Sequence, residues 1–166
     1  MLDTEEIVIN TGPLIALVAA LGDLQVLAVY RRVLVPFEVC EEIRAGGSTG
    51  FAVGEFEKAT GLQKLEKPIE IAPILMNSLG KGEAAVIQLA QDEKIPTVCI
   101  DEAVGRRIAR LSELSVTGSI GVLLRAKREG HPFSMQEAIQ KMRDKGIWLS
   151  ERVVNFALTQ ARETGA

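Results

Sequence analysis

The chain has 166 residues, of which 47% are hydrophobic and 4% are aromatic, and its formal net charge at neutral pH is −3. This length suits a single domain over residues 1–166 with a sizeable aliphatic core. The negative charge excludes a general attraction to nucleic acid, so RNA or DNA binding would need a local basic patch.

Three further features bear on where the protein acts. The longest apolar stretch, PLIALVAAL, is too short to span a bilayer, so we expect no membrane partner. The first residues lack the basic and apolar segments of a signal peptide. Cys40 and Cys99 both lie in apolar segments, which favours buried thiols over a disulfide. Together these features predict a cytoplasmic protein.

Short apolar runs alternate with helical patterns along the chain. The runs predict strands, buried on both faces, at Ile7–Ile9, Val33–Val35, Thr97–Ile100 and Leu114–Val116. Helical patterns cover residues 13–29 with a break at Gly22, then 36–44, 83–93, 102–112, 118–129, 134–145 and 150–163. The glycine-rich stretch Gly46–Gly54 predicts a mobile loop, and residues 60–81 contain a candidate for a short edge strand. The alternation predicts an α/β fold with a parallel sheet and helices on both of its faces.

Polar residues stand where the predicted strands give way to helices. Asn10 ends the first strand, Asp101 ends the run TVCI, and Thr117, Gly118 and Ser119 end the last strand. Ligands bind beyond the carboxyl ends of parallel strands, so these groups would meet at one edge of the sheet. Asn, Asp, Ser and Thr are also good helix N-caps, and capping is the alternative explanation for each of them.

Two glutamates on predicted helices extend this set. Glu83 shares a helical stripe with the apolar residues three, four and seven positions later, so its carboxylate is expected to point toward the core. A favourable charge at a helix N-terminus is the alternative for this residue. In VCEEI, Glu42 lies three residues after Val39 and is favoured as the inward carboxylate, whereas Glu41 remains open.

The candidate cluster therefore consists of Asn10, Glu42, Glu83 and Asp101. Neighbouring carboxylates repel one another and would take up protons unless a cation held them. An all-oxygen set without His or Cys selects Mg²⁺ or Mn²⁺ over zinc, and such an ion can activate water against a phosphodiester. The only histidine, His131, lies in a predicted turn outside this set.

Five segments, in order along the chain, resemble landmarks of the PIN-domain superfamily. They are INTGPLIAL, VPFEVCEEI, GKGEAAVIQLA, TVCIDEAVGRRIAR and VTGSIGVLLRAKREG. The resemblance is strongest to the VapC-like branch of prokaryotic predicted nucleases. It implies a three-layer α/β/α sandwich with a central, mainly parallel sheet, a core over residues 6–150 and a C-terminal helix over 150–163. It also implies metal-dependent ribonuclease activity; many members are toxins held in check by a small antitoxin, and many form dimers.

The resemblance places the four acidic positions of the family on Asn10, Glu42, Glu83 and Asp101. Three of these residues match the pattern and Asn10 departs from it. An amide oxygen can still bind a hard cation, but it brings no charge and cannot serve as a base. Catalytic activity is therefore the expectation that depends most on this one residue.

Contacts to a nucleic-acid substrate are expected beside the cluster. The resemblance gives Thr11 as the hydroxyl of the first motif, and Ser119 offers a second hydroxyl at a helix start. Arg106, Arg107 and Arg110 lie on the helix that follows the third predicted strand and are candidates for phosphate contacts. A solvated helix face is the alternative explanation for these arginines.

Three functions from different classes fit the sequence. The first is a metal-dependent endoribonuclease that uses Mg²⁺ or Mn²⁺, acts on RNA and is the toxin of a toxin–antitoxin pair, with an antitoxin or a second copy of the chain as partner. The second is a catalytically weak or silent PIN-like module that binds RNA or a protein partner, for which Asn10 is the main support. The third is a doubly wound phosphotransfer or nucleotide-binding domain, which Asp101 alone would fit.

Overall fold

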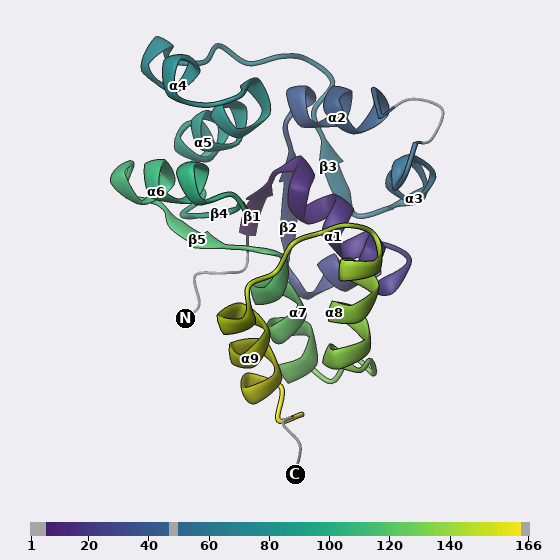
Figure 1. Ribbon diagram of the computed structural model, residues 1–166. Coiled ribbons are helices and arrows are strands. Elements are labelled where there is room, and N and C mark those ends of the chain that lie inside the picture. The colour runs from purple at the N-terminus through teal and green to yellow at the C-terminus, as the bar shows by residue number, and fades with distance from the viewer. Residues whose placement is uncertain (1–5, 47–49, 164–166) are drawn as a thin grey trace.

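The computed structural model describes residues 6–46 and 50–163, which form one five-stranded sheet covered by helices (Figure 1). The strands are β1 (Glu6–Ile9), β2 (Arg32–Val35), β3 (Leu62–Lys64), β4 (Thr97–Cys99) and β5 (Ser115–Thr117). The helices are α1 (Thr11–Leu21), the 3-10 helix η1 (Gln25–Val29), α2 (Phe37–Arg44), α3 (Val53–Lys58), α4 (Pro73–Ser78), α5 (Lys81–Glu93), α6 (Ala103–Leu111), α7 (Ser119–Arg128), α8 (Met135–Asp144) and α9 (Glu151–Gln160).

The strands of the described sheet are all parallel and lie in the order β3-β2-β1-β4-β5. β1 is central, and its Val8 pairs with Leu34 of β2 on one side and with Val98 of β4 on the other. Helices α2, α5 and α6 cover one face, whereas α1, α7, α8 and α9 pack together on the other. This arrangement is the α/β/α sandwich that the sequence predicts.

The junction between β1 and α1 lies at the centre of the molecule. The β1 residues Ile7, Val8 and Ile9 are completely buried. Helix α1 is apolar on nearly all sides, as expected of a helix that packs against α7 and α8 as well as beside the sheet. The helix ends at Gly22, whose positive φ of 87° lets its N–H donate to the carbonyl of Val18 at 2.8 Å. Asn10, between strand and helix, is thus held on both sides by buried structure.

The predicted elements form in the predicted order, with ends shifted by a few residues. One expectation is wrong: the last strand is not buried on both faces, because β5 is an edge strand and Ser115 is exposed. Residues 60–81 contain the edge strand β3, and also the short helix α4, which the sequence pattern does not predict. Part of the predicted loop Gly46–Gly54, residues 47–49, lies outside the described residues, and its last two residues belong to α3. α3 and α4 have six residues each, too few for a helical period to show.

Two other expectations concern membranes and thiols. Within residues 6–46 and 50–163, no helix combines the length and the apolar character needed to cross a membrane. Cys40 and Cys99 are free and buried, as predicted, and burial raises the pKa of both thiols. Buried thiols of this kind pack as small apolar side chains.

Candidate functional site

The carboxyl ends of β1 and β4 are neighbours at the edge of the sheet where the strand order changes direction. β1 pairs with β2 on one side and with β4 on the other, so the chain after β1 and the chain after β4 leave toward opposite faces. Parallel α/β sheets bind ligands at such a switch point. Asn10 follows β1 and Asp101 follows β4, which places both residues at this edge.

Asn10 is buried, with 5% of its surface exposed. Its backbone N–H donates to the carbonyl of Cys99 on the neighbouring strand at 3.1 Å. Its side chain makes no capping hydrogen bond to α1, and its Oδ1 atom is buried without a hydrogen-bond partner. Leaving a buried oxygen unpaired costs about 1 to 3 kcal/mol, so such an atom calls for an explanation such as a ligand. Helix capping therefore does not account for Asn10.

Glu42 approaches this position from α2. The Thr11 hydroxyl donates to Glu42 Oε1 at 2.5 Å, a contact between residues 31 positions apart. A Cβ atom at Gly82 would lie 2.7 Å from Glu42 Oε1 and 3.5 Å from Asn10 Oδ1. The two oxygen atoms therefore flank the same point at the start of α5, where a larger residue than glycine would crowd them. Of the two candidate glutamates on α2, Glu42 is the one that the structure brings to Asn10.

Glu83, the residue after that glycine, brings a second carboxylate. Its Oε2 atom is buried without a hydrogen-bond partner and would lie 2.8 Å from a Cβ atom at Gly105 of α6. Burial raises the pKa of Glu83, and the negative charges of Glu102 and Glu42 raise it further. Asn10, Glu42 and Glu83 thus form a cluster of oxygen atoms, in part desolvated, between α1, α2 and α5. We call these three residues the oxygen cluster.

Glu102 is the acidic residue that sequence reasoning missed. It precedes α6, makes no capping hydrogen bond there, and is close enough to Glu83 to raise the pKa of that carboxyl. The available signal was the second acidic residue of IDEAV, which follows the strand end just as Asp101 does. Glu102 therefore joins the negative potential around the oxygen cluster.

Asp101 makes its hydrogen bond at the start of α7. Its Oδ1 atom accepts the backbone N–H of Ser119 at 2.8 Å. A Cβ atom at Gly118 would lie 2.5 Å from this oxygen and 2.8 Å from Nη1 of Arg106, so glycine leaves room for both groups. A carboxylate at a helix N-terminus is stabilised by the unpaired N–H groups there. Of the four predicted residues, Asn10, Glu42 and Glu83 come together, and Asp101 stands at the helix next to them.

Comparison with known proteins assigns the chain to a family. A family model for the PIN domain matches residues 6–163 of the chain. The chain belongs to the PIN-domain family. No curated protein and no solved structure matches it. The PIN family is nuclease-like. The match also includes α8 and α9, which follow all five segments on which the resemblance rests.

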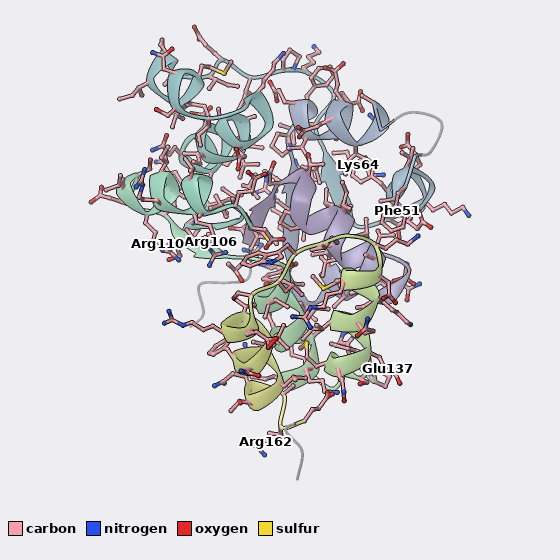
Figure 2. All side chains as sticks on the ribbon, viewed as in Figure 1. Phe51, Lys64, Arg106, Arg110, Glu137 and Arg162 are labelled. Atoms are coloured by element: carbon pink, nitrogen blue, oxygen red, sulfur yellow. The ribbon has the colours of Figure 1, made fainter. Side chains whose placement is uncertain are left out.

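The residues predicted to contact the substrate of this PIN domain differ in exposure and in hydrogen bonding. The Thr11 hydroxyl is engaged with Glu42, and Ser119 is 2% exposed. The substrate contacts expected of these two hydroxyls stay predictions. Arg106 is half-buried and donates to the carbonyl of Ile100 at 2.7 Å, whereas Arg107 and Arg110 are exposed. Figure 2 shows Arg106 and Arg110 side by side along α6.

The donor set of the oxygen cluster suits a hard cation. Carboxylate and amide oxygens are ligands that Mg²⁺ and Mn²⁺ accept, and these ions keep several water ligands. Within the part of the PIN domain that the structure describes, no three His, Cys, Asp or Glu side chains converge closely enough to hold an ion by themselves. The amide oxygen of Asn10, which lacks a partner, would be the third oxygen donor beside Glu42 and Glu83.

Proposed function

We propose that this PIN domain is a metal-dependent endoribonuclease that uses Mg²⁺ or Mn²⁺. The observation that supports it best is the pair of buried oxygen atoms without partners, Asn10 Oδ1 and Glu83 Oε2, beside the Glu42 carboxylate. Unpaired buried oxygens and adjacent carboxylates are unfavourable in the free protein, and a cation relieves both. The chain belongs to a nuclease-like family, and a cation at this position would support cleavage of a phosphodiester.

Each residue of the oxygen cluster has its own part in this proposal. Glu42 and Glu83 supply negative charge, and Asn10 supplies a neutral oxygen that cannot take up a proton. The Thr11 hydroxyl, by donating to Glu42 Oε1, holds that carboxylate in one orientation. A bound divalent cation lowers the pKa of water and neutralises charge that develops on a phosphodiester. Arg107 and Arg110, both exposed on α6, would contact the phosphates of the RNA.

Calorimetric titration with Mn²⁺ tests the metal site directly. We expect binding by the wild-type chain and at least a ten-fold loss of affinity in Glu42→Gln and in Glu83→Gln. Glu41→Gln, which changes the neighbouring glutamate of α2, is the matched control and should bind as the wild type does. Equal affinities for Glu41→Gln and Glu42→Gln would contradict the assignment of Glu42.

Cleavage of a mixed-sequence RNA tests the reaction. The wild-type chain should cleave RNA in Mg²⁺ or Mn²⁺ and should stop when EDTA is added, and Glu83→Gln should be inactive under both conditions. Glu41→Gln should cleave at the wild-type rate. Metal-independent cleavage, or equal rates for the wild type and Glu83→Gln, would refute the proposed mechanism.

The second candidate is a silent PIN domain that binds RNA without cutting it. The observation in its favour is Asn10, which leaves the oxygen cluster with one negative charge fewer than a carboxylate would give. In this case the wild-type chain binds RNA but does not cleave it, and Asn10→Asp gains cleavage. Activity of the wild type itself decides for the endoribonuclease. The family match removes the support for a phosphotransfer or nucleotide-binding domain.

We further propose that the enzyme is the toxin of a toxin–antitoxin pair and forms homodimers. The resemblance to the VapC-like branch supports both, and Ile74 on α4 and Leu111 on α6 are apolar side chains, 74% and 77% exposed, that a partner would cover. Induced expression should arrest growth, and co-expression of a small protein encoded next to it should relieve the arrest. Light scattering should give twice the mass of the chain; a monomer would contradict the dimer.

A further inference from the structure

A cleft of about 530 Å³ opens beside Asp101 and the start of α7. One wall consists of β5 residues and the first turns of α7, and the other consists of residues 147–150 and the exposed side of α9. Asp101 and Arg106 line this cleft, whereas Asn10, Glu42 and Glu83 do not. Asp101 follows β4, the strand next to β1, so the cleft begins at the sheet edge where Asn10 also lies. A volume of this size accommodates a small molecule or one nucleotide.

Two aromatic side chains line this cleft with much of their surface in water. Trp148, between α8 and α9, is 83% exposed, and Phe156 on α9 is 55% exposed. Trp148 is the only tryptophan of the chain, which contains few aromatic residues in total. Two exposed aromatic rings that line one cleft form an apolar patch, and exposed apolar patches mark binding grooves more often than single exposed side chains do.

The charged residues that line the cleft are Arg106 and Asp101. Arg106 lines the cleft and its guanidinium is held in place by the carbonyl of Ile100. Arg110, one helical turn further along α6, lies beside Arg106 (Figure 2). Exposed aromatic rings together with a fixed arginine are the combination by which proteins bind unpaired nucleotides, since rings stack with bases and arginine attracts phosphate.

We propose that this cleft binds one unpaired nucleotide of the RNA substrate, with its base stacked on Trp148 and its phosphate near Arg106. Phe156 provides a second apolar contact to the base. A base held in a duplex cannot reach the indole, so the cleft takes up a nucleotide only where the RNA is unpaired. This proposal rests on the proposed endoribonuclease function and adds to it a nucleotide-binding site outside the oxygen cluster.

The fluorescence of Trp148 reports directly on the cleft, because no other tryptophan contributes to the signal. The full chain is titrated with a single-stranded RNA of about 12 nucleotides, a length that spans one binding site. A second titration uses the blunt duplex of the same sequence. EDTA is present throughout, so that cleavage cannot occur. We expect saturable quenching by the single strand and little quenching by the duplex. Equal quenching by both forms, or none by either, would overturn the proposal.

Variants separate stacking from a merely apolar contact. Trp148→Leu should weaken binding of a labelled single strand by about ten-fold, and Trp148→Phe should restore most of the affinity. Met76→Ala, which removes an exposed apolar side chain of α4 outside the cleft, is the matched control and should bind as the wild type does. Trp148 is exposed, so each variant should keep the wild-type unfolding temperature. Unchanged affinity in Trp148→Leu would refute the stacking contact and leave a protein partner as the occupant of the cleft.

The two proposals fail in different ways. If the wild type does not cleave RNA in Mn²⁺ but its fluorescence is quenched by the single strand, the nuclease proposal is wrong and the cleft still binds a nucleotide. If the wild type cleaves RNA and Trp148→Leu binds and cleaves it equally well, the nucleotide site is wrong and the nuclease proposal stands.

Discussion

Introducing a carboxylate at Asn10 tests the oxygen cluster most directly. Asn10→Asp has nearly the same shape as the wild type, so it changes charge and little else. The new carboxylate would be 95% buried, because Asn10 is 5% exposed, and it would face Glu42 across the point at Gly82. Without a cation this substitution adds a charge to a site that already lacks hydrogen-bond donors.

The expected loss of stability follows from this geometry. Two carboxylates about 5 Å apart repel by about 3 kcal/mol at an effective dielectric constant of about 20. Uptake of a proton limits the loss, because protonating a carboxyl of ordinary pKa at neutral pH costs about 4 kcal/mol. We therefore expect the metal-free variant to lose about 2 to 4 kcal/mol of unfolding free energy.

Urea unfolding at several pH values, with EDTA or with Mn²⁺, measures this effect. Burial and repulsion raise the pKa of the new carboxyl in the folded state, so the loss grows as pH rises and disappears below about pH 4, where folded and unfolded chains are both protonated. Saturating Mn²⁺ should cancel the loss, since a ligand that binds only the folded state stabilises it. Mn²⁺ affinity should rise about ten-fold or more, and any RNA cleavage should accelerate.

A matched control separates the site from a general effect of charge. Asn77→Asp makes the same change on the exposed side of α4 and should alter stability by less than about 0.5 kcal/mol. If Asn10→Asp behaved like Asn77→Asp in stability, Mn²⁺ affinity and activity, Asn10 would not belong to a metal site.

Three further predictions concern other parts of the chain. Gly82→Ala should fold normally but bind Mn²⁺ several-fold more weakly in calorimetry, because its Cβ would displace cluster oxygens; Gly54→Ala, with open space around it, should change nothing. Replacing Arg107 and Arg110 by alanine should make the plot of log binding constant against log salt concentration for single-stranded RNA shallower by about 1.4. An unchanged slope would mean that these arginines only face solvent and do not contact RNA. Burial would raise the pKa of the Glu163 carboxyl. Hydrogen bonds from the Lys127 side chain and from the backbone N–H groups of Met135 and Gln136 outweigh this effect and lower the pKa to about 2. Glu163→Gln should therefore lose about 2 kcal/mol of unfolding free energy at neutral pH, and the difference should fade as pH falls from about 5 toward 2, since the wild type then loses its charge.

The sequence by itself determined the fold class and the positions that matter at strand ends. Apolar runs without polar alternation are typical of strands buried on both faces, and such strands pair in parallel under helices. β1, β2 and β4 follow this rule, whereas the edge strand β5 does not. Because the carboxyl ends of parallel strands share one edge, Asn10 and Asp101 could be assigned to that edge without coordinates. Helical periodicity also favoured Glu42 and pointed Glu83 inward, since residues three or four positions apart share a face.

Only the tertiary structure decided which of these groups meet. Periodicity gives the face of one helix, but the rotation and offset of neighbouring helices depend on how side chains interlock across the core. This packing brings Glu42 to Thr11, 31 residues away, places Glu102 near Glu83, and turns Asp101 toward the start of α7. The cleft beside Trp148 has the same origin, because its walls come from segments about 30 residues apart. No local pattern in the sequence encodes such distances, because they are set by the whole packed core.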